Sequence, residues 1–159
     1  MKEKLINAMR EHFGADARRI DHALSVLGFA EELIAREGGD PGIVVPAAIL
    51  HDTGIKPAEK KYGSSAGHYQ EKEGPPVARK ILLKLGYGKE ETEEICTIIA
   101  HHHSPGKVTT LNFQLLYEAD WLVNLGDDFA GLDPEKKKRL IEKNFATETG
   151  KALALSLHT

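Results

Sequence analysis

The sequence predicts an all-α fold, a compact helical bundle of seven or eight helices. Its 159 residues are enough for one domain, and no low-complexity linker divides them, so we expect a single domain over residues 1–159. Apolar residues recur at helical spacing along most of the chain. Alternating runs rich in Val, Ile and Thr, which are typical of strands, are missing.

The predicted helices begin and end at recognisable residues. Asp16 can cap a helix that runs to about Glu37, where Gly38 and Gly39 end it. An apolar helix then begins near Ile43 and stops at Gly54, and a loop is expected over residues 63–67. The later helices are expected from Pro75 to Gly86, from Lys89 to about His103, from Leu111 to Leu125, from Pro134 onward and after Gly150.

Composition and charge exclude several classes of protein. The 21 Lys and Arg residues against 24 Asp and Glu residues leave a net charge of −3 with no polybasic run, so no stable nucleic-acid complex is expected. The single cysteine, Cys96, excludes an intramolecular disulfide and fits a reducing compartment. No stretch approaches 18 apolar residues. We therefore expect a cytoplasmic protein that does not associate with membranes, and its oligomeric state stays open.

Two carboxylates occur where the apolar pattern predicts burial. The apolar run Ile43–Leu50 ends in the pair His51-Asp52, and Asp120 points in the same direction as the apolar side chains of its own helix. A buried carboxylate without a partner is costly, so each needs a cation, a cluster of donors or a shifted pKa. A metal ion would meet this need at both positions.

Several histidines could join these carboxylates. His22 lies at the edge of an apolar stripe, and His102 continues a stripe of isoleucines at helical spacing, with His101 and His103 at roughly 100° on either side. Which of the two flanking residues faces the site stays open, and His68 lies in a predicted loop. Imidazole and carboxylate ligands suit Mn²⁺, Fe²⁺, Co²⁺, Ni²⁺ or Zn²⁺. The remaining histidines are expected at the surface: His12, His103 and His158.

The order of these residues resembles the HD superfamily of metal-dependent phosphohydrolases. Residues 49–54, Ile-Leu-His-Asp-Thr-Gly, look like the apolar-His-Asp-x-Gly signature of that family. Residues 98–102, Ile-Ile-Ala-His-His, are similar to its downstream His-His element, and residues 118–122 look like its Ala-Asp helix. The resemblance runs from about His22 to Leu125 and implies an HD-domain-like fold.

The resemblance also implies a set of ligands. The first His, the His-Asp pair and the final Asp of the family bind one divalent metal, which implies His22, His51, Asp52 and Asp120 here. Members with extra histidines hold a second metal bridged by the Asp of the pair. The residues that lie in such places are His68, His101 and His102. One or two transition-metal ions are therefore the expected cofactor.

The expected reaction is hydrolysis of a phosphoester or phosphoanhydride bond in a nucleotide or another small phosphorylated metabolite. The candidate catalytic residues are Asp52, His68 and Lys56, although Lys56 lies one position beyond the place of the lysine in a His-Asp-x-Gly-Lys pattern. The candidate substrate-binding residues are Arg18 and Arg19, which flank His22 and suit a phosphate, and Tyr117, which would stack on a base.

Two other functions stay open at this point. Some relatives on the same scaffold hold two irons and activate O₂ to cleave a carbon bond, which would make the chain a di-iron oxygenase. Alternatively, the site would bind a nucleotide without turning it over, as a non-catalytic module. Elemental analysis of the isolated protein would separate one ion, two ions and none.

Overall fold

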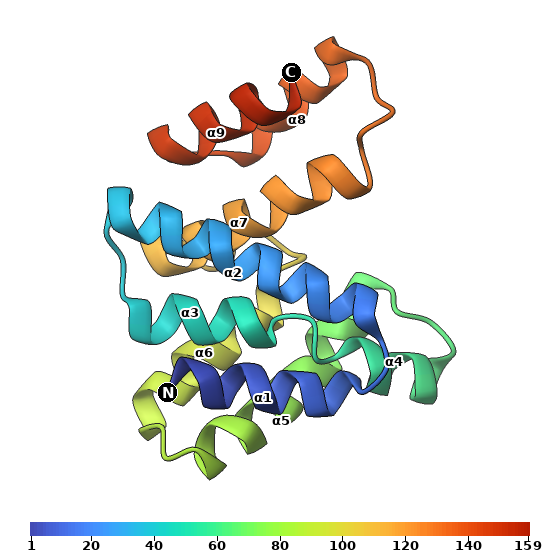
Figure 1. The fold of residues 1–159 in the computed structure, drawn as a ribbon, viewed down its shortest axis with the longest axis vertical. Coiled ribbons are helices and arrows are strands. Elements are labelled where there is room, and N and C mark those ends of the chain that lie inside the picture. Colours follow the sequence, from blue (N-terminus) through green and yellow to red (C-terminus); the bar gives the residue numbers. More distant parts are fainter.

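The computed structural model describes residues 1–159 and contains nine α-helices and no strand (Figure 1). The all-α prediction is confirmed, and α1 and the short α4 come from segments in which the sequence patterns predict no helix. The helices are α1 (Lys2–Phe13), α2 (Ala17–Glu37), α3 (Pro41–Leu50), α4 (Ile55–Tyr62), α5 (Gly67–Lys84), α6 (Lys89–His101), α7 (Leu111–Asp127), α8 (Pro134–Asn144) and α9 (Glu148–His158). No helix is long and apolar enough to cross a bilayer.

Helix α3 is the centre of the core and contacts α1, α2, α6 and α7 (Figure 1). The Asp40 side chain accepts a hydrogen bond from the amide of Gly42, so the helix begins at Pro41, earlier than the predicted Ile43. Most of its side chains are buried, as its uniformly apolar sequence predicts. The end of α3, which carries the His-Asp pair, therefore lies inside the molecule.

Helices α2 and α7 pack on each other and on α3. Asp16 caps α2 as predicted, because its side chain accepts a hydrogen bond from the amide of Arg19. His22 lies on the second turn of α2, and Asp120 lies near the middle of α7. The packing of these three helices therefore brings together four polar side chains, those of His22, His51, Asp52 and Asp120.

Helix α5 begins at Gly67 rather than at the predicted Pro75, so both Pro75 and Pro76 lie inside it. Proline inside a helix removes a backbone hydrogen bond, which is why the sequence pattern favours a start at Pro75. Packing overrides that preference here. A Cβ atom on Gly54 would lie 2.6 Å from the Gly74 amide nitrogen, which shows that the turn after α3 lies directly against the α5 backbone.

Replacing Gly54 by Ala is expected to destabilise the protein by about 1–3 kcal/mol. The added methyl group would lie 2.5 Å from the Gln70 carbonyl oxygen, and both of its nearest neighbours are backbone that no rotamer change can move aside. Urea denaturation followed by circular dichroism measures the loss. Gly28→Ala is the matched control, because a Cβ on Gly28 meets no atom within 4 Å. Equal stability of the two variants would contradict this account of the close approach.

Helices α8 and α9 lie beyond α7 at one end of the molecule (Figure 1). Helix α9 begins at Glu148, so Gly150 lies inside it rather than before it as predicted. Glu118 of α7 is fully buried and accepts hydrogen bonds from the amides of Ala146 and Thr147 and from the side chain of Gln114. Hydrogen bonds to this carboxylate therefore connect α7 to the start of α9.

Candidate metal centre

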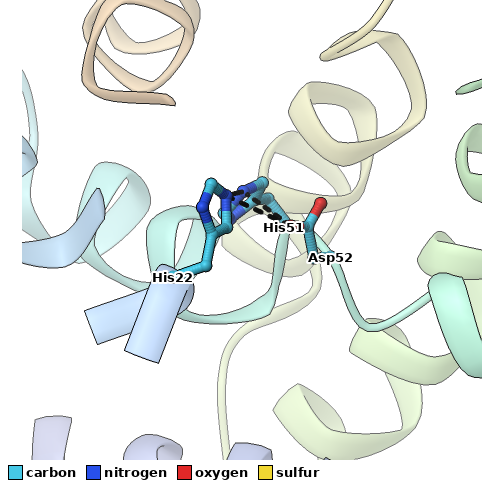
Figure 2. Close-up of side chains that lie close together, drawn as sticks. All are labelled: His22, His51 and Asp52. Atoms are coloured by element: carbon cyan, nitrogen blue, oxygen red, sulfur yellow. Dashed lines mark hydrogen bonds and ion pairs between the residues drawn. The ribbon is translucent and has the colours of Figure 1, made fainter. Parts of the chain in front are cut away.

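Four side chains from three helices meet at the end of α3. His51 and Asp52 leave the end of α3, His22 comes from α2, and Asp120 comes from α7. Figure 2 shows the rings of His22 and His51 close together, tilted against each other, with Asp52 beside them. The structure therefore brings together the four residues that the sequence proposes for one metal.

The nitrogen and oxygen atoms of these side chains lie at short distances from one another. His22 Nε2 is 3.0 Å from Asp120 Oδ1 and 3.3 Å from Asp52 Oδ2. His51 Nε2 is 3.3 Å from Asp120 Oδ1 and 3.4 Å from Asp52 Oδ2. The two Nε2 atoms are themselves 3.3 Å apart. Ligands held around one ion by bonds of about 2.1 Å are separated by about 3.0–3.5 Å. The spacing of His22, His51 and Asp52 therefore fits a shared transition metal, and Asp120 lies at similar distances from both histidine nitrogens.

Backbone carbonyls orient two of the histidine rings. His51 Nδ1 lies 2.8 Å from the carbonyl oxygen of Ala48, and His102 Nδ1 lies 2.6 Å from that of Ile99. A carbonyl oxygen only accepts, so each Nδ1 carries a hydrogen and donates it. The Nε2 atoms are therefore the nitrogens that can bind a metal, and a hydrogen bond from the other ring nitrogen to a carbonyl oxygen is typical of metal-ligating histidines.

The two oxygens of Asp52 face different groups of histidines. Oδ2 faces His22 and His51, whereas Oδ1 lies 3.5 Å from His102 Nε2. That Nε2 atom is buried and has no hydrogen-bond partner. Ligand atoms of Asp52, His102 and His103 lie within 4.8 Å of one another, as do those of His22, His51 and Asp52. The Asp52 carboxylate is thus shared by two groups that could each hold an ion.

His103 is exposed, as the sequence pattern predicts, and it also belongs to this second group. Helix α6 ends at His101 and the C-cap His102 keeps a helical backbone, so the angular spacing of a helix no longer applies from His103 onward. The first turns of α5 then hold His103. Its Nε2 lies 2.9 Å from Gln70 Oε1, its amide donates to Glu71 Oε2, and a Cβ on Gly67 would lie 3.1 Å from its own Cβ.

The proton position on His103 follows from its contact with Gln70. Gln70 Nε2 donates to the carbonyl oxygen of Ser65 at 2.6 Å, which fixes Oε1 as the atom that faces His103. Because an amide oxygen only accepts, Nε2 of His103 carries the hydrogen. Nδ1 is therefore the nitrogen of His103 that is left with a free lone pair.

Burial and charge shift the pKa values of this cluster strongly. Burial alone would lower the pKa of His51, but the adjacent carboxylates of Asp52 and Asp120 outweigh it and raise the pKa to about 10. Burial alone would raise the pKa of Asp52, but the charge of His51 and contact with His102 lower it to about 2. The pKa of Asp120 is also lowered, because the charge of His51 and the hydrogen bond from His22 outweigh its burial.

Metal binding is expected to release about one proton per chain at neutral pH. His51 is protonated below its raised pKa of about 10, and a metal must displace the proton on Nε2. The apparent affinity for Mn²⁺ should therefore rise about tenfold per pH unit near neutrality. Calorimetric titration in buffers of different ionisation enthalpy counts the released protons. Uptake of protons, or an affinity independent of pH, would contradict the protonation state assigned to His51.

A polar cavity of about 370 Å³ opens onto this cluster. Of the predicted phosphate contacts, Arg18 and Arg19 both line it, and Ile55 is its one apolar residue. Arg19 is held in ion pairs with Asp16 and Glu59, whereas Arg18 makes no ion pair. The other polar lining residues beyond the cluster are Ser65, Gln70, Asn124, Asp127 and Asp128.

Four of the candidate residues are not brought to the cluster. His68 is exposed and packs against Tyr69, because its segment is the first turn of α5 rather than a loop. The remaining three have other partners: His101 Nδ1 lies 2.9 Å from the Thr97 carbonyl oxygen, Lys56 Nζ donates to Phe13 O at 2.8 Å, and Tyr117 Oη donates to Asn144 Oδ1 at 2.6 Å. Their predicted roles in metal binding, catalysis and base stacking therefore find no support in this geometry.

Comparison with known proteins decides the family. The family model described as HD domain matches residues 19–125 of the chain. The chain belongs to the HD domain family. A crystal structure described as that of a predicted HD superfamily hydrolase, from an uncultured Thermotogales bacterium, is similar to it. The two are 26% identical, with a TM-score of 0.71 over 97% of this chain and 83% of that one. A comparison with curated proteins gives no significant match.

The HD domain contains the whole cluster of His and Asp side chains. All the side chains that meet at the end of α3 lie within the matched residues, and the resemblance that the sequence shows is confirmed. The family is one of metal-dependent hydrolases, so the donor set and the family agree on a divalent metal. Helices α8 and α9 follow the matched segment and contribute no residue to the cavity.

Proposed function

We propose that this HD protein is a metal-dependent phosphohydrolase that acts on a small phosphorylated metabolite or nucleotide. The observation that carries the proposal is the shared carboxylate of Asp52, whose two oxygens face two groups of histidines below a cavity that contains Arg18. When bound, a divalent cation lowers the pKa of a water ligand and neutralises charge on phosphoryl oxygens.

Residues of the cluster at the end of α3 would hold the metal ions. His22, His51 and Asp120 would hold one ion together with Asp52 Oδ2, and His102 and His103 would hold a second together with Asp52 Oδ1. Burial of this cluster limits its contact with water and strengthens its electrostatic interactions.

Arg18 is the cation best suited to the substrate phosphate. Its guanidinium lines the cavity without an ion-pair partner, whereas the guanidinium of Arg19 is occupied by Asp16 and Glu59. Guanidinium and phosphate form paired hydrogen bonds of matching geometry. The lining offers no Phe, Tyr or Trp ring for a nucleobase, which favours a compact polar metabolite over a nucleotide within this proposal.

Arg18→Ala is expected to raise KM about 10–100-fold, since a hydrogen bond to a charged group contributes about 1.5–3 kcal/mol. The metal content should not change, because Arg18 forms no hydrogen bond or ion pair with the clustered side chains. Steady-state kinetics with the best substrate measures the effect, and Arg10→Ala on the exposed face of α1 is the control. An unchanged KM would remove Arg18 from substrate binding.

The proposal is tested by measuring phosphate release from a broad panel of nucleotides, sugar phosphates and other phosphorylated metabolites. The protein is first analysed for bound elements and then assayed with Mn²⁺, Fe²⁺, Co²⁺, Ni²⁺ or Zn²⁺. Metal-dependent release supports the proposal. Two tightly bound irons with O₂-dependent turnover would instead favour the oxygenase, and tight nucleotide binding without turnover under every metal would favour the binding module.

A further inference from the structure

The largest cavity described in this molecule lies away from the metal centre, between α1 and α5. Its volume is about 590 Å³, compared with about 370 Å³ for the cavity over the metal centre, and the two share no residue. Its walls come from positions 4 to 12 of α1 and from positions 77 to 84 of α5 with Leu85, which follows the last residue of that helix. Nothing in the proposed hydrolysis uses this groove between α1 and α5.

The α5 wall of the groove carries a row of aliphatic side chains. Val77, Ile81 and Leu85 are spaced four residues apart, so they lie on one face and span about 12 Å of helix. All three are half-buried: Ile81 and Leu85 pack partly against the core, and all three line the groove. The groove therefore offers an elongated apolar surface to a ligand.

The rim of the groove is positively charged. Lys4, Lys80 and Lys84 line it, and none of the three forms an ion pair. Glu11 is the single acidic residue of the lining, and His12 is committed to the Thr53 carbonyl oxygen at 2.8 Å. Three lysines against one glutamate favour a negatively charged headgroup.

We propose that this groove binds a small amphipathic anion, a free carboxylate that carries a linear apolar chain. The chain would lie along the aliphatic row of α5, and the carboxylate would lie among the lysines. The groove is lined by 10 residues, whereas stable protein interfaces use roughly 20–30 residues on each side, so its size fits a small molecule rather than a protein partner. The volume lies within the usual range of ligand sites, roughly 300–1,000 Å³.

The test uses the full chain, loaded with Mn²⁺, and decanoate as the probe at concentrations below micelle formation. Calorimetry should show saturable binding of one decanoate per chain, and decylamine, with the same chain and the opposite charge, should bind at least about tenfold more weakly. The double variant Lys80→Glu with Lys84→Glu should lose at least about tenfold in affinity for decanoate. Ile81→Asp should also weaken decanoate binding, because it places a charge in the aliphatic row that would contact the alkyl chain.

The matched control is Lys107→Glu with Lys138→Glu, which makes the same change of charge at two exposed lysines outside the groove. This variant should bind decanoate as the unmodified protein does, and circular dichroism checks that every variant is folded. Absence of saturable binding would overturn the proposal. Equal binding of decanoate and decylamine, or unchanged affinity in the Lys80/Lys84 variant, would overturn it as well.

Discussion

Replacing Asp52 by Asn is expected to remove bound metal and to lower the rate of the proposed hydrolysis at least about 100-fold. The amide keeps the size of the side chain but loses the negative charge and one of two acceptor oxygens. Both oxygens of Asp52 are in use, since Oδ2 faces His22 and His51 while Oδ1 faces His102. Elemental analysis of the purified variant and its steady-state rate measure the two losses.

Asp21→Asn is the matched control for this experiment. Asp21 lies beside His22 on α2 but is exposed, so the same chemical change should leave metal content and rate unaltered. Circular dichroism establishes that both variants are folded. Retention of the full metal content by Asp52→Asn would contradict the shared position of this carboxylate, whatever the rate.

The sequence predicts the parts of the fold that depend on local signals. The Asp16 cap and the apolar run before His51 define α2 and most of α3, because capping and periodicity act within a few residues. The start of α5 is different. Pro75 is a strong local signal for a helix start, but contact between Gly54 and Gly74 determines the observed backbone, and that contact joins distant segments.

The candidate site also combines residues whose positions follow from local signals with residues whose positions depend on distant segments. His102 continues an apolar stripe of α6 and is buried, as helical spacing predicts. His103 follows the last turn of α6, so its direction depends on α5, where Gln70 and Glu71 hold it. The signal that could have indicated the direction of His103 is Ser104-Pro105, because a proline disfavours helical backbone in the residue before it and so predicts that the helix ends close to His103.

Glu118→Ala is expected to reduce the free energy of unfolding by at least about 3 kcal/mol. The carboxylate is fully buried, and its partners include the amides of Ala146 and Thr147 and the side chain of Gln114. Thr147 caps α9, so the negative charge also lies at the positive end of that helix. Without Glu118 these donors lose their acceptor, and the buried Thr147 amide cannot reach water. Urea denaturation measures the change.

Two further variants separate the carboxylate from the loss of side-chain volume. Glu118→Gln keeps the volume but has one acceptor oxygen, so it should retain part of the stability that Glu118→Ala loses. Glu142→Ala removes a carboxylate whose side chain is 64% exposed and should change stability by no more than about 0.5 kcal/mol. If Glu118→Ala were as stable as Glu142→Ala, the start of α9 would not depend on this carboxylate. Because α8 and α9 contribute nothing to the cavity, metal binding by folded Glu118→Ala should persist.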